Sequence, residues 1–498
     1  MKRFNCDFSS RFRILKGGKI SLVVSALLAS TTVSFAAPSG GVVTSGSATI
    51  SQSGNTTNIT QSTSKATINW NSFSIASNET VNFNQPNVNS ITLNRVIGNE
   101  RSIIDGALNA NGQVWILNSN GILFNSSAKI NTAGIIATTK NISDADFNAS
   151  KYKFSGGSSA SVINMGEITA NDSGYVAMLA NTVQNNGTIK AYKGTVHLTG
   201  ASEATINLNG NSIVSLTVNK GVLDALVENK NIIQADGGKI YLTTNAVDEL
   251  LRGVVNNTGV IEAKSIDDMF SEVVLFAHGG TANVSGTIEA KGGFVETSGK
   301  DLSVADGTVI KAKKWLLDPT NVIVDELANG GTITAATIES QLNAEGVSEI
   351  EIQADGGDIT INQAINIYTE DGSTDEGIQY TVGGLTLIAG NDININEVIT
   401  VGTEGYLALN HGWNGTEWDG SNEATVYGNG GKITFGMNET KTDFTGKVVF
   451  ADNENTHLPN NSIYINEVEQ TLIRDATELQ AMGEAANLTG NFVLANDI

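Results

Sequence analysis

The fold is decided by residues 82–139, NFNQPNVNSITLNRVIGNERSIIDGALNANGQVWILNSNGILFNSSAKINTAGIIATT. Apolar runs of only a few residues, such as Val114–Leu117 and Ile122–Phe124, alternate with clusters of Asn, Gly and Ser. Apolar runs of this length bounded by turn residues predict β-strands. Asn and Gly tolerate the left-handed backbone conformation that tight turns need. The stretch therefore predicts short strands joined by tight turns.

Two patterns recur at a spacing of about 20 residues after this stretch. The first is an aliphatic residue, Asn, Gly, Ile and Ala separated by spacers, and it occurs at residues 163–170, 183–191, 255–263 and, loosely, 284–290. The second is Gly followed by an alternating apolar run, and it occurs at residues 174–179, 194–198 and 238–242. A repeat of this length made of strands and turns is typical of a parallel β-helix with one coil per repeat.

We therefore expect an all-β fold, a right-handed parallel β-helix (a solenoid), with about a dozen coils between residues 69 and 317 stacked about 4.8 Å apart. A globular β-sandwich is the alternative, but it does not explain a repeat that returns to the same residue types in register. The β-helix predicts two interior ladders, one of Ile168, Ile189, Ile261 and Ile288 and one of Val176, Val196 and Ile240.

A charge placed in an interior ladder should be far more damaging than a charge beside it. Ile189→Asp should cost several kcal/mol, because a buried charge has no partner there. The neighbours Thr188 and Lys190 are expected to face solvent, so Asp at either should change stability by no more than about 0.5 kcal/mol.

Three segments depart from the repeat. Residues 40–71 are rich in Ser, Thr and Asn and predict an N-terminal cap over the first strand edge, which would otherwise pair with other chains. Residues 141–157, NISDADFNASKYKFSGG, carry more charge and more aromatic residues and predict a short excursion from the helix. Residues 247–252 have apolar residues at helical spacing and predict a helical turn.

The first 36 residues have the features of a secretory signal peptide. Six basic residues precede the apolar run Ile20–Leu28, and Ser34–Ala36 supplies small residues for cleavage after Ala36. A membrane anchor would need about 20 apolar residues, and Ser and Thr interrupt this run. The only cysteine, Cys6, lies in the leader, so the mature chain would form no disulfide.

The chain is strongly acidic. Loss of the leader, whose six basic residues and Asp7 sum to +5, takes the net charge from −22 to −27. Nucleic-acid binding needs basic patches, so this charge argues against a nucleic-acid partner. It favours solubility of a secreted protein.

Several motifs in residues 93–122 occur in the order found in one family of exported proteins. They are Leu93–Val96, Gly106–Leu108, Ala110–Val114 and Asn118–Ile122. This region resembles the secretion domain of filamentous-haemagglutinin-like exoproteins, the exported partners of two-partner secretion systems, and most of all the high-molecular-weight adhesins. Where the family usually has Pro in its Asn-Pro-Asn-Gly-Ile turn, this chain has Ser119, which leaves one φ angle free.

The resemblance implies a partner and a set of site residues. The partner is an outer-membrane β-barrel transporter, whose periplasmic domains could add the passenger as an extra strand. Folding would then proceed outside the cell, each coil templating the next. The residues expected to set this early structure and its recognition are Asn94, Arg95, Asn118, Ser119, Asn120, Gly121 and Ile122.

The resemblance extends over residues 40–325 and suggests the domain organisation. Residues 292–299 and 315–319 resemble the end of the family's haemagglutinin-like region. We therefore expect a signal peptide at 1–36 and a β-helical secretion domain at 37–320. A further β-rich region with repeats about 34 residues apart would span 321–470, and residues 471–498 resemble the start of a repeat of bacterial surface proteins. A solenoid that stops there without a cap suggests a truncated chain.

Nothing in the sequence assembles a catalytic or metal site by spacing, and we expect no enzymatic activity, cofactor or metal. The four histidines, His197, His278, His411 and His457, lie far apart, and His197 is expected to be an ordinary surface histidine. A β-helical polysaccharide lyase would need clustered carboxylates with calcium or a basic residue. Acidic residues do gather at residues 355–376, but no arginine lies beside them and a solvated loop explains them.

The expected function is that of a secreted adhesin at the bacterial cell surface, attaching to a host-surface glycan or protein receptor. A contact-dependent toxin or cytolysin exported by the same route is the alternative, because such proteins carry their activity in regions beyond this one. Asn-x-Ser/Thr sequons are frequent, and some resembled adhesins are glycosylated at such asparagines.

Overall fold

The computed structural model describes residues 37–245, 253–266, 269–342, 347–367 and 384–391, and beyond them only short segments between residues 393 and 494. The chain divides into two units, Met1–Phe35 and Ala36–Ile498, and the elements given below belong to the second. The helical turn expected at residues 247–252 lies outside the described residues.

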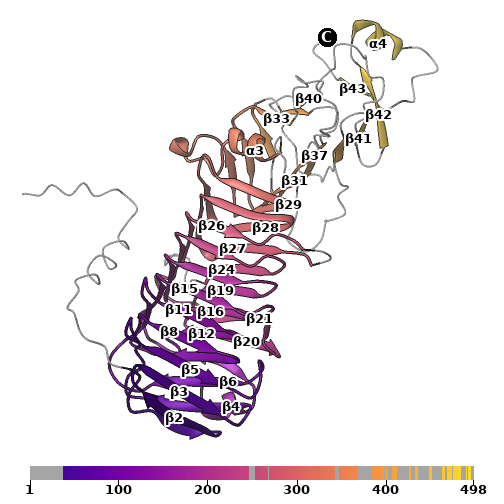
Figure 1. Ribbon diagram of the computed structural model, residues 1–498. Helices are drawn as coiled ribbons and strands as arrows, with labels where there is room; N and C mark the ends of the chain where they lie inside the picture. The colour runs from indigo at the N-terminus through magenta and orange to yellow at the C-terminus, as the bar shows by residue number, and fades with distance from the viewer. Residues whose placement is uncertain are drawn as a thin grey trace, which may run out of the picture. The chain divides into compact units, whose positions relative to one another are not determined.

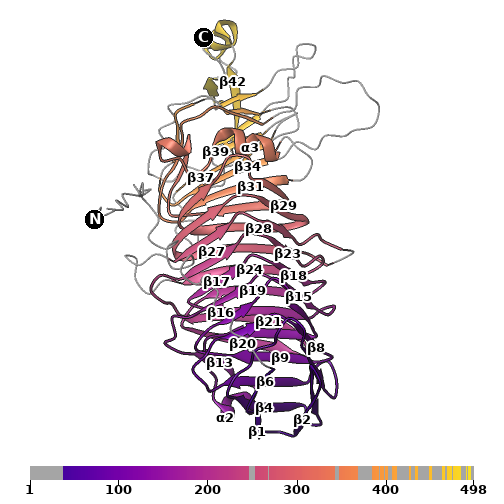
Figure 2. The same cartoon turned by 60° about the vertical axis from the view of Figure 1, so that its left-hand side comes forward.

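Parallel strands stack in chain order from Thr56 onward (Figures 1 and 2). The strand pairings form three series, so three strands make one coil. Sheet A contains β4 (Lys65–Trp70), β6 (Ile91–Val96), β9 (Gln113–Leu117), β12 (Gly134–Thr138), β16 (Tyr175–Ala180), β19 (Thr195–Gly200), β24 (Lys239–Asn245) and parts of β27 (Glu272–Val284), β28 (Thr287–Val304) and β29 (Val309–Asp318). Sheet B contains β3 (Thr56–Gln61), β5 (Thr80–Asn84), β8 (Ala107–Ala110), β11 (Lys129–Thr132), β15 (Glu167–Ala170), β18 (Thr188–Ala191), β23 (Ile232–Gln234), β26 (Val260–Glu262) and the first parts of β28 and β29. Sheet C contains β7 (Ser102–Ile104), β10 (Ile122–Phe124), β14 (Ser161–Asn164), β17 (Thr182–Asn185), β22 (Leu226–Asn229), β25 (Val254–Asn257) and the last parts of β27 and β28. The fold is a parallel β-helix, as predicted.

The interior of the coils is filled by the predicted ladders. Ile168 pairs in register with Ile189, and Ile261 pairs with Ile288, and the side chains of all four are fully buried. Val176, Val196 and Ile240 form the second ladder. The first ladder has further members. Ile233 lies between Ile189 and Ile261, Ile130 pairs with Ile168, and Ile310 pairs with Ile288. The same residue type therefore recurs at one position of each coil because the side chains at that position in successive coils stack on one another.

A buried ladder of asparagines accounts for the Asn of the recurring pattern. Four asparagines are fully buried in this ladder: Asn164, Asn185, Asn229 and Asn257. Each of the first three donates through Nδ2 to the Oδ1 of the next, and Asn257 donates to Ser285 O. The Asn–Asn distances are 2.8–2.9 Å. A buried amide must be hydrogen-bonded, and here the asparagine of the next coil supplies a partner, together with backbone carbonyls such as Gly166 O and Ile232 O. The ladder therefore fixes the register of neighbouring coils.

The first coil is closed by antiparallel strands, as the predicted cap requires. β1 (Val42–Ser45) pairs with β4, and β2 (Ala48–Ser53) pairs with β3. Antiparallel pairing at the end of a parallel stack covers the edges of β3 and β4.

The predicted excursion at residues 141–157 forms α2 (Asp144–Asn148) and β13 (Tyr152–Ser155). β13 pairs with β20 (Glu203–Asn209), which pairs with β21 (Ser212–Lys220), so two distant insertions form one antiparallel sheet outside the helix. This sheet packs on the outer face of sheet A around a second hydrophobic core centred on Trp115. The Trp115 ring makes edge contacts with the rings of Phe147 and Tyr152.

Lys190 lies on the outer surface of sheet B, as expected, with 45% of its side chain exposed. Its Nζ lies 2.9 Å from Glu167, which Lys129 also contacts at 2.7 Å. The two lysines lower the pKa of Glu167 to about 2. Lys190→Asp would place a second carboxylate beside Glu167, so it is not a neutral control for a ladder substitution.

The stack continues past Pro319. β29 pairs with β31 (Val347–Ala354), β31 pairs with β34 (Gly384–Ala389), and β34 pairs with β37 (Tyr406–His411). The 34-residue spacing seen in the sequence places Ile359 beside Ile393. The remaining described elements are β30 (Val322–Val324), η2 (Leu327–Asn329), α3 (Ala335–Leu342), β32 (Ile359–Ile361), β33 (Ile365–Ile367), β35 (Ile393–Ile395), β36 (Ile399–Val401), β38 (Thr425–Tyr427), β39 (Lys432–Phe435), β40 (Val448–Phe450), β41 (Ser462–Ile465), β42 (Val468–Ile473), α4 (Ala476–Ala481) and β43 (Phe492–Leu494).

Candidate functional site

The predicted turn joins β9 of sheet A to β10 of sheet C, and Asn118 holds it together. The Asn118 Nδ2 donates to Glu100 O (2.9 Å) and Ser102 Oγ (3.0 Å), and its Oδ1 accepts from the backbone N and the Nδ2 of Asn120. The Asn120 Nδ2 also donates to Gly98 O at 2.9 Å. Both asparagines therefore bind this turn to the turn of the preceding coil.

Gly121 and Ile122 complete the turn. Gly121 has a φ of +102°, and a Cβ there would lie 3.0 Å from Ser161 O in the next coil, so glycine is required. Ile122 is buried in the interior. Ser119, at the position of the family's Pro, is exposed, and its carbonyl accepts from Ser158 Oγ at 2.6 Å.

Asn94 and Arg95 lie in the preceding coil, in register with Ile116 and Leu117 just before the turn. Asn94 is fully buried. Its Oδ1 accepts from Trp70 Nε1 at 3.0 Å, and its Nδ2 donates to Thr92 O and Trp115 O. Asn94 thus links the first three strands of sheet A from the inside.

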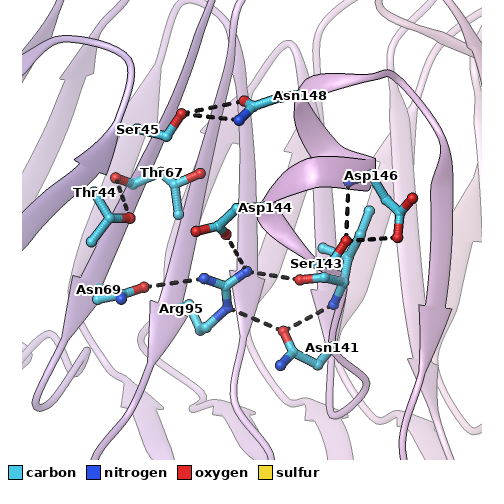
Figure 3. Close-up of polar contacts among 11 residues, drawn as sticks. Thr44, Ser45, Thr67, Asn69, Arg95, Asn141, Ser143, Asp144, Asp146 and Asn148 are labelled. Atoms are coloured by element: carbon cyan, nitrogen blue, oxygen red, sulfur yellow. Dashed lines mark hydrogen bonds and ion pairs between the residues drawn. The ribbon is translucent and has the colours of Figure 1, made fainter.

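Arg95 points to the outer face of sheet A and holds the α2 excursion (Figure 3). Its guanidinium contacts Asp144 Oδ1 (2.8 Å), Ile142 O (2.8 Å), Asn141 Oδ1 (3.1 Å) and Asn69 Oδ1 (3.3 Å). We call residues 141–150 the strap. A planar guanidinium with five fixed donors suits such a set of acceptors.

The strap has two further attachments to the first coils. Lys65 Nζ donates to Phe147 O and Ser150 Oγ, each at 2.7 Å, and Asn148 hydrogen-bonds Ser45 Oγ. The Ser143 Oγ caps α2 by accepting from Asp146 N. A segment that follows β12 in the chain is thus attached to β1, β4 and β6 of the first two coils.

The predicted site residues therefore form one continuous region across two successive coils, but no exposed patch. Asn94 is buried among the interior side chains, Arg95 binds the strap, and Asn118–Ile122 bind neighbouring turns. The side-chain polar groups of Asn94, Arg95, Asn118 and Asn120 hydrogen-bond within the chain, and Ser119 is exposed. Their role in transporter recognition stays a prediction, and the geometry favours an effect through the fold of the first coils.

Sequence reasoning missed Lys140 beside this region. Its side chain is buried, and its Nζ donates to Ser158 O (2.9 Å) and Asn181 Oδ1 (2.7 Å). Burial lowers the pKa of Lys140 to about 8. A lysine that follows a run of apolar and Thr residues gave the only hint of this burial.

His197 corrects another expectation, because it is not a surface histidine. It does point outward from β19, but its side chain is 6% exposed beneath β21 and stacks on Tyr241 at 4.7 Å. Burial lowers the pKa of His197 to about 3. The cover comes from the β20–β21 insertion, which the local sequence around His197 does not reveal.

Two observations in the described part of the chain concern metal binding and acid–base chemistry. There, no group of three or more His, Cys, Asp or Glu side chains is placed to hold a metal ion. Asp318 on sheet A has its pKa raised to about 7 by burial and by the nearby Asp355, Glu296 and Glu351. Of the acidic residues at 355–376, Asp371, Asp375 and Glu376 lie outside the described residues. Among the helices that the structure describes, none has the length and apolarity to cross a bilayer.

The fold and site define a β-helical solenoid whose first coils are closed by a cap and a strap. Its residues 34–276 match the TPS secretion domain family. The chain thus carries the secretion domain of a two-partner secretion exoprotein, as the motifs indicated. Such a domain implies a secreted or cell-surface passenger that is recognised by an outer-membrane transporter.

Two curated relatives are both heme/hemopexin-binding proteins of Haemophilus influenzae. One is 38% identical over 172 residues, which cover 32% of this chain and 19% of the relative. The other is 44% identical over 96 residues, which cover 19% of this chain and 10% of the relative. The matched region thus spans a fifth or less of the length of these relatives. The solved HMW1 secretion domain from the same species has the same fold, with a TM-score of 0.53 and 24% identity over 83% of this chain and all of that chain.

Proposed function

We propose that this chain is the export-competent N-terminal region of a non-enzymatic adhesin, released by its transporter after a leader has been cleaved following Ala36. The observation that carries this proposal is the TPS secretion domain at residues 34–276, folded as a capped β-helix. Its receptor would be a glycan or protein of the host surface.

The order of folding follows from the attachments of the first coils. β2 has no strand on its second edge within the described residues, so the cap offers backbone groups to which a transporter strand could add. The strap follows these coils in the chain and contacts them through Arg95 and Lys65. The first coils would therefore form first and be stabilised only after the strap has been exported and has bound them. Folding outside the cell would then proceed from the N-terminus toward the C-terminus.

A second candidate function comes from the relatives, whose printed names describe heme/hemopexin binding. Under this candidate the passenger captures a heme-carrying protein. The third candidate is a contact-dependent toxin or cytolysin, whose activity would lie outside the matched region, since that region covers a fifth or less of the length of the relatives.

The export proposal is tested by expressing the gene with and without its transporter gene. Release of the chain into the medium should require the transporter, and N-terminal sequencing of the released chain should begin at Ala37. Equal release without the transporter would overturn the proposal.

Adhesion and heme capture are separated by two assays on the full-length gene product. For an adhesin, deletion of the gene lowers attachment of the bacteria to host cells, and the purified protein causes no change in the absorbance spectrum of added heme or heme-loaded hemopexin. Normal attachment with a heme spectral change would favour the second candidate.

A further inference from the structure

A groove of about 750 Å³ lies between β21 and the outer face of sheet A. One wall is formed by six consecutive residues, Ile213–Val218, and the floor includes His197, Tyr241 and Phe276 from three successive coils. Met269 and Phe270 form the far rim. We call this the β21 groove. It is distinct from the turn and strap described above.

The wall of the groove is an unpaired strand edge. β21 is the last strand of the β13–β20–β21 sheet, and within the described residues no strand pairs with its second edge. Native edge strands usually carry Pro, a charge or a bulge that blocks further pairing. Ile213–Val218 contains neither Pro nor a charged residue. The β20–β21 pair does have two register shifts, one at Val214 within this segment and one at Asn219 just beyond it. The open edge offers backbone donors and acceptors to an extended segment.

The floor and rim are apolar and aromatic. His197 and Tyr241 stack at 4.7 Å, and the rings of Phe276 and His278 meet edge-on at 5.6 Å. Val214 is 68% exposed and Phe270 is 62% exposed, which is unusual for side chains of this type. Large exposed apolar side chains on opposite sides of a groove indicate a binding surface.

The chain as a whole is acidic, with a net charge of −22. Among the residues that the structure describes, the charged side chains that line the groove are basic, Lys193 and Lys239. Both lysines lie at one end, where β19 and β24 begin. The Ser212 end of β21 lies there too, because Ser173 accepts from Ser212 Oγ and donates to Tyr192 O. Lys239 also contacts Glu272 at 2.6 Å, so Lys193 is the more available cation.

We propose that the β21 groove binds an extended segment of a partner protein, which adds to the free edge of β21 as a fourth strand. Alternate apolar side chains of this segment lie on the aromatic floor, and an acidic residue of the segment lies at the Lys193 end. Backbone pairing supplies affinity in this mode, and the alternate side chains supply specificity. This binding mode would serve the receptor binding proposed above. It rests on that proposed function only for the assignment of the partner protein to the host surface.

The experiment starts from a displayed library of random heptapeptides panned on the purified chain. Selected peptides should alternate apolar residues and carry Asp or Glu near one end. A selected peptide should slow hydrogen exchange of backbone amides in β21, which a ligand lying only on the floor would not do. Val214→Lys should weaken its binding at least tenfold. The matched control is Val42→Lys, because Val42 is a valine of similar exposure, 60%, far from the groove.

Four results would overturn strand addition: no selected peptide, binding unchanged in Val214→Lys, β21 amides that exchange at the same rate with peptide bound, or a dimer of the chain that Val214→Lys dissolves. Binding of a glycan array that depends on Val214 without protecting β21 amides would assign the groove to a sugar instead. All of these assays use purified protein. Failure of transporter-dependent release is therefore a separate result, which concerns the proposed export function alone.

Discussion

Asn118 uses every hydrogen-bonding group of its amide within the chain. Two donors meet Glu100 O and Ser102 Oγ, and the oxygen accepts twice from Asn120. A carboxamide has this capacity and no more. Replacement of Asn118 by alanine would leave the groups that it binds, such as Glu100 O and the Asn120 backbone N, without this hydrogen-bond partner. At the scale of the residue, the turn motif is thus explained by satisfaction of buried groups.

Asn118→Ala should therefore lower the free energy of unfolding by about 1–3 kcal/mol, the usual cost of leaving buried polar partners unsatisfied. Chemical unfolding of the chain followed by tryptophan fluorescence measures this. Ser119→Ala, one residue away and exposed, should change the value by no more than about 0.5 kcal/mol. Equal effects at the two positions would contradict the hydrogen-bonding account.

His197 should make stability fall in mild acid. Its pKa is about 3 in the folded chain and about 6.5 when unfolded. Between these values the unfolded chain binds a proton that the folded chain does not. The contribution of the neutral His197 side chain to the free energy of unfolding is therefore fully present above pH 6.5. It declines as the pH falls toward 3, by at most about 1.4 kcal/mol per pH unit.

The measurement is the change in unfolding free energy between pH 7 and pH 5 for the wild type and for His197→Phe, which keeps a ring against Tyr241. Carboxylates titrate in both chains, so the difference between the two slopes reports the histidine. The wild type should show the steeper decline. Identical slopes would mean that His197 is solvated.

The strap shows at the scale of the element how distant segments are joined. Its contacts with Arg95 and Lys65 connect residues more than 45 positions apart in sequence. Arg95 is largely buried, whereas its partner Asp144 is about half exposed. The several hydrogen bonds of the Arg95 guanidinium should therefore stabilise the strap more than the single ion pair with Asp144. A surface pair alone would contribute little.

Arg95→Lys should loosen the strap although it keeps the charge, because an ammonium cannot reach four acceptors arranged for a planar fork. Hydrogen exchange of amides in α2 should rise at least tenfold, while amides of β15 and β18 stay protected. Lys153→Ala removes an exposed ion pair with Glu203 on the same outer sheet and should leave α2 protection unchanged. Wild-type protection of α2 in Arg95→Lys would show that the apolar contacts alone hold the strap.

Local sequence patterns predicted the residues that repeat in every coil. They did not predict the residues that an insertion covers or displaces. Ile168, Ile189, Ile261 and Ile288 were found because each coil presents the same stacking environment. Ile233 was missed because the β20–β21 insertion, residues 203–220, displaces it from the period. The same insertion covers His197. The Asn118–Ile122 turn was recognised, but its inward bonds depend on the preceding coil, which a linear motif does not show.

The stability of the whole molecule depends on the stacking of successive β-helix coils. Each coil shares its interface with its neighbours, so damage to one coil should spread. Residues 253–342 and the strands after Pro319 continue the same pairing scheme. No disulfide contributes in the described part, which contains no cysteine.

Ile168→Asp and Thr169→Asp test this at adjacent positions. Ile168 is fully buried in the ladder, and Thr169 lies on the outer face between Asn131 and Lys190. The first change should cost several kcal/mol and increase proteolysis of the coils on either side. The second should stay within about 0.5 kcal/mol, because Lys190 is nearby. Equal, small effects would mean that the period of the helix was misread.

Export is expected to depend on the fold of the first coils, and the amount of chain released into the medium measures this dependence. The chain carrying both Asn118→Ala and Asn120→Ala is expressed with the transporter, beside the wild type and Ser119→Ala. Release of the double variant should fall at least tenfold, whereas Ser119→Ala should be released like the wild type. Release of the double variant at the wild-type level would mean that export does not depend on this turn.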